Sequence, residues 1–255
     1  MYQHYRHEEL RKKSSDLGII FDVMVTGVTG AGKSTTLNTI FQKEIAKVGR
    51  GVDPETMHLD SYKLNDSFRL WDTPGLGDGK QNDKNHCRSL ISLLYKDYGD
   101  KYGFIDLVLV ILDGSSKDMG TTYKLLNEVV VPNFQKDRIL IAINQADVAM
   151  KGHHWNHREN KPEHTLIDFL ENKSNSVQER VFEATGIKIN RPIYYSAECN
   201  YNIDKLLDMI INNINPATKY PNYGIIQAWK RSMPVNCPAQ PKTKCAARPC
   251  DCAQS

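Results

Sequence analysis

Short apolar runs alternate along the chain with longer segments in which apolar residues recur every three or four positions. The runs at 19–25, 105–112, 139–143 and 192–196 predict buried strands, and the periodic segments between and after them predict helices, one of them at 121–131. Strands that alternate with helices predict a parallel α/β sheet with helices on both faces. The clearest helix follows Asn202, which we expect to cap it, and its apolar stripe is Ile203, Leu206, Leu207, Ile210, Ile211 and Ile214.

Two regions depart from this alternation. Residues 57–64 and 68–71 alternate polar and apolar positions around the turn pair Asn65-Asp66, which predicts two antiparallel strands. Residues 148–162 hold three histidines and Trp155 between Gly152 and Pro162, which predicts an inserted loop. Packing around Trp155 is a simpler role for this insertion than a histidine metal site.

The stretch Gly27-Val28-Thr29-Gly30-Ala31-Gly32-Lys33-Ser34 has the spacing of a phosphate-binding P-loop. It lies between a predicted strand and a predicted helix, as that motif requires. Glycines let backbone N–H groups surround a phosphate, the helix dipole adds positive potential, and Lys33 is expected to reach the β and γ phosphates. The predicted phosphate-binding residues are Gly27, Thr29, Gly30, Ala31, Gly32, Lys33, Ser34 and Thr35.

Other candidate residues follow the predicted strands. The hydroxyl of Ser34 and the carboxylate of Asp72 are hard oxygen ligands suited to Mg²⁺. Gly75 is suited to presenting its N–H to a γ-phosphate. Asn144 and Asp147 supply an amide and a carboxylate three residues apart, and a carboxylate that accepts two N–H groups from one base edge selects guanine over adenine.

Composition and charge bear on the cellular location of the protein more than on its function. A net charge of +3 and a pI near 8.4 give no strong signal for nucleic-acid binding. No secretory signal or transmembrane run is apparent, so we expect a cytoplasmic protein with reduced cysteines. Residues 232–255 contain four prolines and no Leu, Ile, Phe, Tyr or Trp. This composition predicts a disordered tail, and a lipidation site at its end is a weaker alternative.

Taken in order, Gly-x₄-Gly-Lys-Ser, Asp-x-x-Gly, Asn-x-x-Asp and Ser-Ala resemble the signature of the Ras-like and translation-factor-related GTPases over about 19–214. Within that class the chain most resembles Era-like bacterial GTPases, including a ribosome-binding or prophage-type branch. The resemblance implies a three-layer G domain with one antiparallel strand, GTP or GDP as ligand and Mg²⁺ as cofactor. It also implies a ribosome or a protein effector as partner and a GTP-dependent homodimer.

The resemblance also assigns roles to residues. Ser196 and Ala197 would hold the guanine carbonyl, Ala197 through its backbone N–H, and Gln145 belongs to the implied nucleotide-binding set. Thr56 matches the switch I threonine and, with Ser34 and Asp72, completes the implied metal ligands. The implied catalytic set is Lys33, Thr56 and Gly75, with switch II at 75–85. Two glycines among charged residues predict that 76–85 is flexible until the next helix begins.

Three positions depart from the family pattern. Gln145 replaces a lysine that usually covers the base, Leu76 replaces the glutamine that orients water in Ras-like enzymes, and Gly30 replaces an asparagine that holds K⁺ in some Era-like enzymes. We therefore expect slow GTP hydrolysis and little stimulation by K⁺.

The sequence predicts four parts: a helical arm at 1–17, the G domain at 18–215, an extension at 216–231 and the tail at 232–255. A molecular switch is the predicted function. The alternatives are an assembly or tethering protein in which hydrolysis is incidental, and a P-loop ATPase.

Overall fold

The computed structural model describes residues 5–16, 20–42, 60–77, 79–98, 102–116 and 119–214. Three sequence predictions lie outside these residues: the switch I threonine Thr56, the extension at 216–231 and the tail at 232–255.

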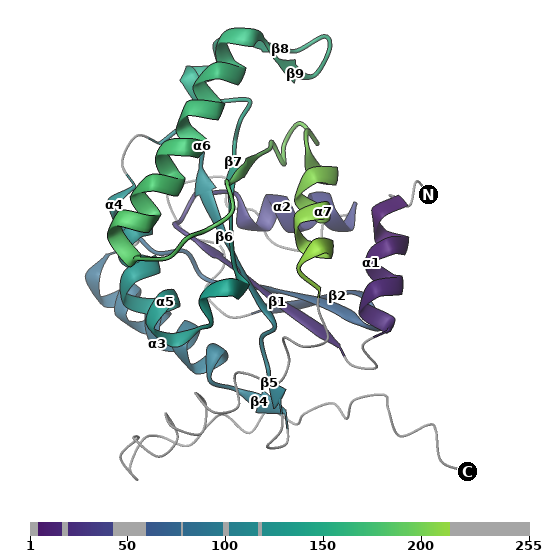
Figure 1. Cartoon of the computed structure of the whole chain (residues 1–255), viewed down its shortest axis with the longest axis vertical. Helices are drawn as coiled ribbons and strands as arrows, with labels where there is room; N and C mark the ends of the chain where they lie inside the picture. The colour runs from purple at the N-terminus through teal and green to yellow at the C-terminus, as the bar shows by residue number, and fades with distance from the viewer. Residues whose placement is uncertain are drawn as a thin grey trace.

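Six strands form one sheet in the order β10-β7-β6-β1-β3-β2 (Figure 1). They are β1 (Phe21–Gly27), β2 (Asp60–Asn65), β3 (Phe68–Asp72), β6 (Leu107–Asp113), β7 (Ile139–Asn144) and β10 (Ile193–Tyr194). Only β2 and β3 pair antiparallel, and the other neighbours in this sheet pair parallel. The prediction of a mostly parallel sheet with one antiparallel strand is therefore confirmed.

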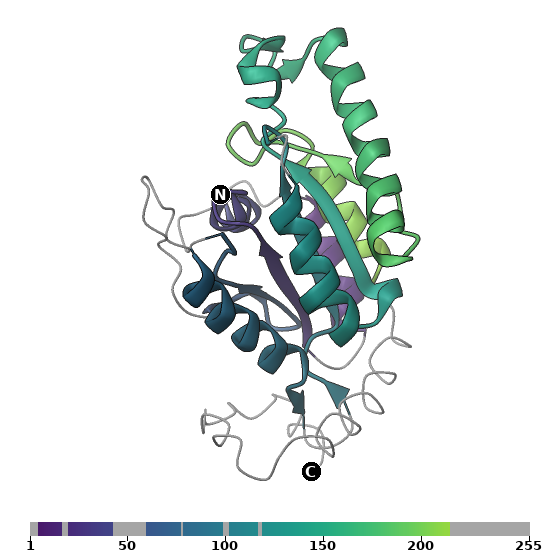
Figure 2. The same cartoon turned by 90° about the vertical axis from the view of Figure 1, so that its left-hand side faces the viewer.

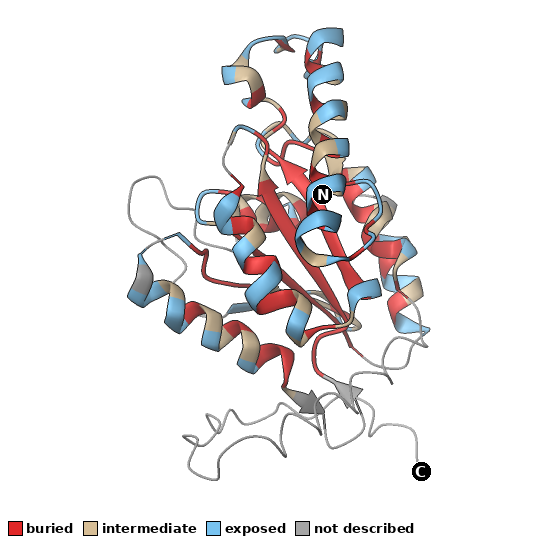
Figure 3. Cartoon of the chain, turned by 60° about the vertical axis from the view of Figure 1, so that its left-hand side comes forward, coloured by how far each residue is buried: buried red, intermediate tan, exposed pale blue. Residues whose placement is uncertain are grey.

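Helices cover both faces of the sheet (Figure 2), so the central strands are buried (Figure 3). One apolar cluster joins the sheet to α1 (Tyr5–Ser15), α2 (Lys33–Phe41) and α7 (Ile203–Asn212). A second cluster joins the opposite face to α3 (Lys80–Leu94), α4 (Gly120–Leu125) and α6 (His164–Thr185). The predicted three-layer arrangement is present.

The remaining elements are short. They are α5 (Val131–Asn133), a π-helical turn η1 (Leu126–Val130), the 3₁₀ turns η2 (Lys136–Arg138) and η3 (Ala149–Gly152), and two ribbons, β4 (Asp97–Tyr98) with β5 (Tyr102–Gly103) and β8 (Trp155–Asn156) with β9 (Lys161–Pro162).

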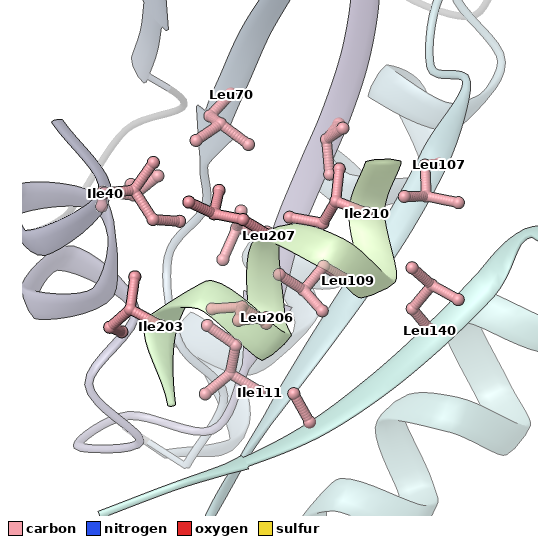
Figure 4. Packing of buried hydrophobic residues seen from close by; sticks show 14 of the residues in the cluster. Ile40, Leu70, Leu107, Leu109, Ile111, Leu140, Ile203, Leu206, Leu207 and Ile210 are labelled. Carbon is pink, nitrogen blue, oxygen red and sulfur yellow. The ribbon is translucent and has the colours of Figure 1, made fainter. Parts of the chain in front are cut away.

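Helix α7 anchors the first cluster. Its residues Ile203, Leu206, Leu207 and Ile210 are all at most 3% exposed and point at strand residues that include Leu109 and Ile111 (Figure 4). An apolar side chain of this size contributes about 1.5–3 kcal/mol when fully buried. The stripe read from the sequence is thus the face that attaches α7 to the sheet.

The predicted N-terminal helix is part of the domain. α1 lies against α7, and its Leu10 is fully buried in the first cluster. The guanidinium of Arg6 bonds the carboxylate of Asp208 on α7, with Nε 2.8 Å from Oδ1.

Four local predictions are corrected by the structure. Helix α3 begins at Lys80, where the sequence predicted a flexible segment up to Asn85. The insertion at 148–162 contains the β8–β9 ribbon instead of only a loop. The helix predicted at 121–131 passes into a π turn at Leu126. Asn202 stands at the start of α7, but its side-chain amide donates to the Tyr194 carbonyl at 3.0 Å instead of capping the first turn.

Within the described ranges, no helix combines the length and apolar character needed to cross a membrane.

The burial of Leu10 gives a test of how α1 belongs to the fold. Leu10→Ala should lower the free energy of unfolding by about 2–5 kcal/mol, because it leaves a cavity between α1 and the sheet. Urea denaturation followed by circular dichroism measures this loss. Lys12→Ala, at an exposed position of the same helix, is the matched control and should change stability by at most about 0.5 kcal/mol. Equal stability of the two variants would contradict the packing of α1.

Candidate functional site

The carboxyl ends of the parallel strands bring the predicted site residues to one edge of the sheet. β1 ends at Gly27 and runs into the P-loop, β3 ends at Asp72, and β7 ends at Asn144. Asp113 at the end of β6 lies beside Asn144 in the register of the two strands. Ligands of open α/β sheets bind at this edge.

The P-loop owes its shape to glycines in left-handed conformations. Gly30 has φ 80° and Gly32, at the start of α2, has φ 82°. A Cβ atom on Gly32 would collide with the side-chain amide of Asn144. The loop therefore turns tightly and leads directly into the amino-terminal end of a helix, which favours anions.

The ammonium group of Lys33 is held over the loop. Its Nζ donates to the carbonyl oxygens of Val28 at 3.0 Å and Gly27 at 3.3 Å, and the residue is 7% exposed. These bonds place a positive charge at the loop before any phosphate arrives.

Ser34 and Asp72 meet as a pair of oxygen ligands. The Ser34 hydroxyl donates to Asp72 Oδ2 at 2.9 Å. Asp72 is fully buried, and its Oδ1 accepts no hydrogen bond among the described residues. Burial raises the pKa of Asp72, although the Ser34 hydrogen bond and the charge of Lys33 oppose that shift. A buried carboxylate oxygen without a partner, next to a hydroxyl, fits the hard-ligand requirement of Mg²⁺.

The segment after Asp72 packs on the P-loop. The Thr29 N–H donates to the Leu76 carbonyl at 2.9 Å, and a Cβ on Gly75 would collide with Thr29. The Leu76 side chain is 4% exposed and lies in the second apolar cluster with Leu90 of α3. Leu76 is therefore an apolar anchor, which explains in physical terms why this position carries no water-orienting amide.

Asn144 uses its side chain to join two loops. Its Nδ2 donates to the Ala31 carbonyl at 3.0 Å, and its Oδ1 accepts the Ala197 N–H at 3.0 Å. The residue is 2% exposed. Asn144 thus fixes the P-loop against the Ser196–Ala197 loop in addition to standing at the end of β7.

The contact made by Asn144 bears on the predicted role of Ala197. The N–H of Ala197 is the predicted donor to the guanine carbonyl, and in this structure the same N–H donates to Asn144. The Ser196 hydroxyl accepts the Cys199 N–H at 3.0 Å, which shapes the loop that follows. The guanine contacts of Ser196 and Ala197 stay predictions.

Gln145 and Asp147 flank the same edge. Gln145 has φ 62°, and its side-chain amide donates to the Gly30 carbonyl at 2.7 Å, so it spans from β7 to the P-loop. Asp147 is partly exposed, so a ligand can reach it. The site residues are therefore gathered at one edge, except Thr56, which lies outside the described residues.

Two further residues hold the site and were not identified from the sequence. His86 of α3 is 7% exposed and its Nδ1 lies 2.9 Å from the Gly75 carbonyl, so Nδ1 carries the donated proton. Lys173 of α6 donates to the carbonyls of Gly114 and Ser116, at 2.5 and 2.7 Å, and burial lowers the pKa of its ammonium group. The Lys173 contacts join residues that are 57 and 59 positions apart, and the His86 contact joins residues 11 positions apart; no motif marks either.

One histidine of the insertion and one of α6 lie beside carboxylates. Nδ1 of His154 is 3.2 Å from Oε2 of Glu163, and Nδ1 of His164, at the start of α6, is 3.0 Å from Oδ2 of Asp168. Among the residues that the structure describes, no three His, Cys, Asp or Glu side chains converge as a metal site. Trp155 is 5% exposed and packs edge-on against Tyr201 with ring centres 5.3 Å apart.

Comparison with known proteins supports a GTPase. Residues 22–145, a little under half of the chain, match the family described as "50S ribosome-binding GTPase". Neuronal-specific septin-3 of Danio rerio is 30% identical over 107 residues, which are 37% of this chain and 29% of septin-3. The chain thus matches less than a third of the length of this relative.

Solved structures share the fold at low sequence identity. Toc33 from Arabidopsis thaliana in complex with Mg²⁺ and GMPPNP has a TM-score of 0.59 and 14% identity over 86% of this chain and 96% of Toc33. Era from Aquifex aeolicus bound to GDP and AlF₄⁻ has a TM-score of 0.50 and 15% identity over 77% of this chain and 57% of Era. These likenesses establish a P-loop GTPase fold, and the finer Era-like assignment is not resolved by them.

The raised pKa of Asp72 gives a test of the buried carboxylate. The pKa of Asp72 is higher in the folded protein than in the unfolded chain, so ionisation of this carboxyl lowers the free energy of unfolding. The full loss is present above the folded-state pKa, and it vanishes as the pH falls below about 4. Without Mg²⁺ and nucleotide, Asp72→Asn should therefore be more stable than the wild type at pH 7, with a difference that shrinks toward pH 4. Thermal denaturation across this pH range measures it. The exposed Asp66→Asn is the control and should show no such trend; the same trend in both variants would contradict the assignment.

Proposed function

We propose that this protein binds GTP and GDP with Mg²⁺ and hydrolyses GTP slowly as a molecular switch. The observation that carries the proposal is the joint placement of the P-loop, the Ser34–Asp72 pair and the Asn144–Asp147 segment at one sheet edge. The match to a GTPase family and the shared GTPase fold support it.

The phosphates would lie on the P-loop. Backbone N–H groups of residues 29–35 would surround them, and Lys33 would add its positive charge close to the β and γ positions. Lys33 already stands over the loop, so little side-chain entropy is lost when a phosphate binds.

Ser34 and Asp72 would hold Mg²⁺, Asp72 directly or through a bound water, with Thr56 as a further proposed ligand. When bound, Mg²⁺ would supply positive charge that offsets the negative charge of the phosphates. Because Asp72 is buried beside Ser34, a cation there would also compensate the carboxylate that burial destabilises.

Guanine would be selected by the Asp147 carboxylate, with Gln145 beside the base and the Ser196–Ala197 loop at its carbonyl. Asp147 would accept the two N–H groups on the guanine edge. Adenine does not present that pair of donors, so an ATPase is the weaker reading of this site.

The switch would act through Gly75. The Thr29 N–H is bonded to the Leu76 carbonyl, so a terminal phosphate that took this N–H would displace the Gly75–Leu76 segment. Loss of that phosphate after hydrolysis would let the segment return. Lys33, Thr56 and Gly75 are the proposed catalytic residues.

We also propose partners for the switch. They are a ribosome or a protein effector, and a second copy of the chain that binds when GTP is bound. An assembly or tethering role with incidental hydrolysis stays the second candidate, because the buried Leu76 leaves this position without a catalytic amide.

Base selectivity tests the proposal. GTP and GDP should raise the melting temperature and ATP should not; at about 100 times Kd a ligand adds roughly 2.7 kcal/mol, which is about 5–11 °C in a domain of this size. Asp147→Asn should weaken GTP binding by at least about 100-fold and favour xanthosine triphosphate, whose edge offers an acceptor in place of a donor. Equal protection of the wild type by ATP and GTP would refute a guanine site.

The rate of GTP hydrolysis tests the proposed catalytic role of this segment. GTP turnover by the isolated protein should be slow, and Leu76→Gln should not accelerate it, because position 76 faces the apolar cluster instead of the nucleotide. The same substitution should lower the free energy of unfolding by about 1–3 kcal/mol, since it buries an amide without partners. Phosphate release under single-turnover conditions and urea denaturation measure the two effects. Rapid hydrolysis by the glutamine variant would show that residue 76 reaches the nucleotide.

A further inference from the structure

The insertion at 148–162 lies directly behind the two loops that the proposed function assigns to guanine. Figures 1 and 2 show the β8–β9 ribbon beside the amino-terminal end of α6, beyond the end of the sheet. It follows Asp147 immediately in the chain. Its contacts with the rest of the protein therefore bear on the base-binding edge.

A third apolar cluster, separate from the two clusters of the sheet, forms between the insertion and these loops. Its buried members are Ala146, Ala149, Trp155, Leu166 and Leu170, and Cys199 and Tyr201 pack against it. Ala146 comes from the Asn144–Asp147 loop, while Cys199 and Tyr201 come from the loop that follows Ser196. Trp155 is the largest buried side chain in this cluster. One residue of the insertion therefore packs in the same cluster as residues of both loops.

The loop that follows Ser196 is held at two points from this side. The side-chain amide of Asn160 in the β8–β9 turn donates to the Cys199 carbonyl at 2.6 Å. Trp155 contacts Tyr201, and Tyr201 exchanges two backbone hydrogen bonds with Ser196, at 2.9 and 3.0 Å. A displacement of the insertion would thus be passed to Ser196 through rigid contacts.

Cys199 joins the insertion to the proposed base loop. Its carbonyl accepts from Asn160 on the insertion, and its N–H donates to the Ser196 hydroxyl at 3.0 Å. Burial raises the pKa of the Cys199 thiol, although the Ser196 hydrogen bond opposes that shift, and the Asp147 carboxylate raises the pKa further.

We propose that the insertion is a positioning element for base recognition, in which Asn160 and Trp155 hold the Cys199–Tyr201 loop so that Asp147 and the Ser196–Ala197 loop meet guanine in a fixed geometry. This inference rests on the proposed function. A preorganised site loses less entropy on binding, so weakening the support should reduce affinity for the base and leave the P-loop's affinity for phosphate unchanged.

Asn160→Gly is the first variant, because Asn160 has φ 51° and glycine keeps that backbone conformation while removing the amide. Trp155→Leu is the second variant and removes the ring contact with Tyr201. Lys151→Gly is the matched control: it has φ 60°, is exposed and belongs to the same insertion.

Two ligands separate base recognition from phosphate binding. A fluorescent GDP analogue reports affinity for the nucleotide, and its displacement by Mg²⁺-tripolyphosphate reports affinity for phosphates alone. GDP should bind about three- to tenfold more weakly to Asn160→Gly and about tenfold more weakly to Trp155→Leu, with tripolyphosphate affinity and the control unchanged.

The inference is overturned if Asn160→Gly binds GDP as the wild type does, or if both variants lose GDP and tripolyphosphate affinity in the same proportion. A different result overturns the proposed function itself: a wild-type protein that displaces the GDP analogue equally with ADP and GDP. The two failures are therefore distinguishable in one experiment.

Discussion

The buried side chain of Asn144 constrains the whole candidate site. Its amide nitrogen bonds the P-loop at Ala31 and its oxygen bonds the Ser196–Ala197 loop, so one small side chain sets the distance between phosphate and base regions. Because both contacts are to backbone atoms, they fix loop geometry independently of the side chains there. The same amide leaves no room for a Cβ on Gly32, so the glycine and the asparagine require each other.

The site edge also contains charges that the fold holds at a cost. Asp72 is buried with one oxygen lacking a hydrogen bond among the described residues, and Lys33 is turned onto carbonyl oxygens of its own loop. Holding such charges costs folding free energy, and in the proposed function a cation with phosphates would offset that cost. Part of the binding energy of the proposed ligands would then come from relief of this cost.

Motifs whose chemistry is local could be predicted from the sequence. The P-loop, the parallel strands of the core, the β2–β3 pair and the stripe of α7 all follow from spacing or periodicity over fewer than about fifteen residues. The docking of α1 and the contacts of Lys173 depend on partners far away in the chain. The His86 contact and the β8–β9 ribbon join residues that are near in sequence, but no periodicity or motif marks them. Asn202 shows the limit most clearly: its position was predictable, but its amide bonds Tyr194 on β10 and not the helix that follows it.

Leu76 and Gln145, two positions that depart from the pattern expected from the resemblance, each have a structural role. The Gln145 amide spans from β7 to the P-loop through the Gly30 carbonyl. Leu76 joins the apolar cluster with α3, while its carbonyl accepts the Thr29 N–H. In the proposed switch, a phosphate oxygen that competed for this N–H would work against the burial of Leu76 and against the His86 contact at Gly75. The free energy between the two proposed arrangements of this segment would then depend on the packing of Leu76 as well as on the phosphate.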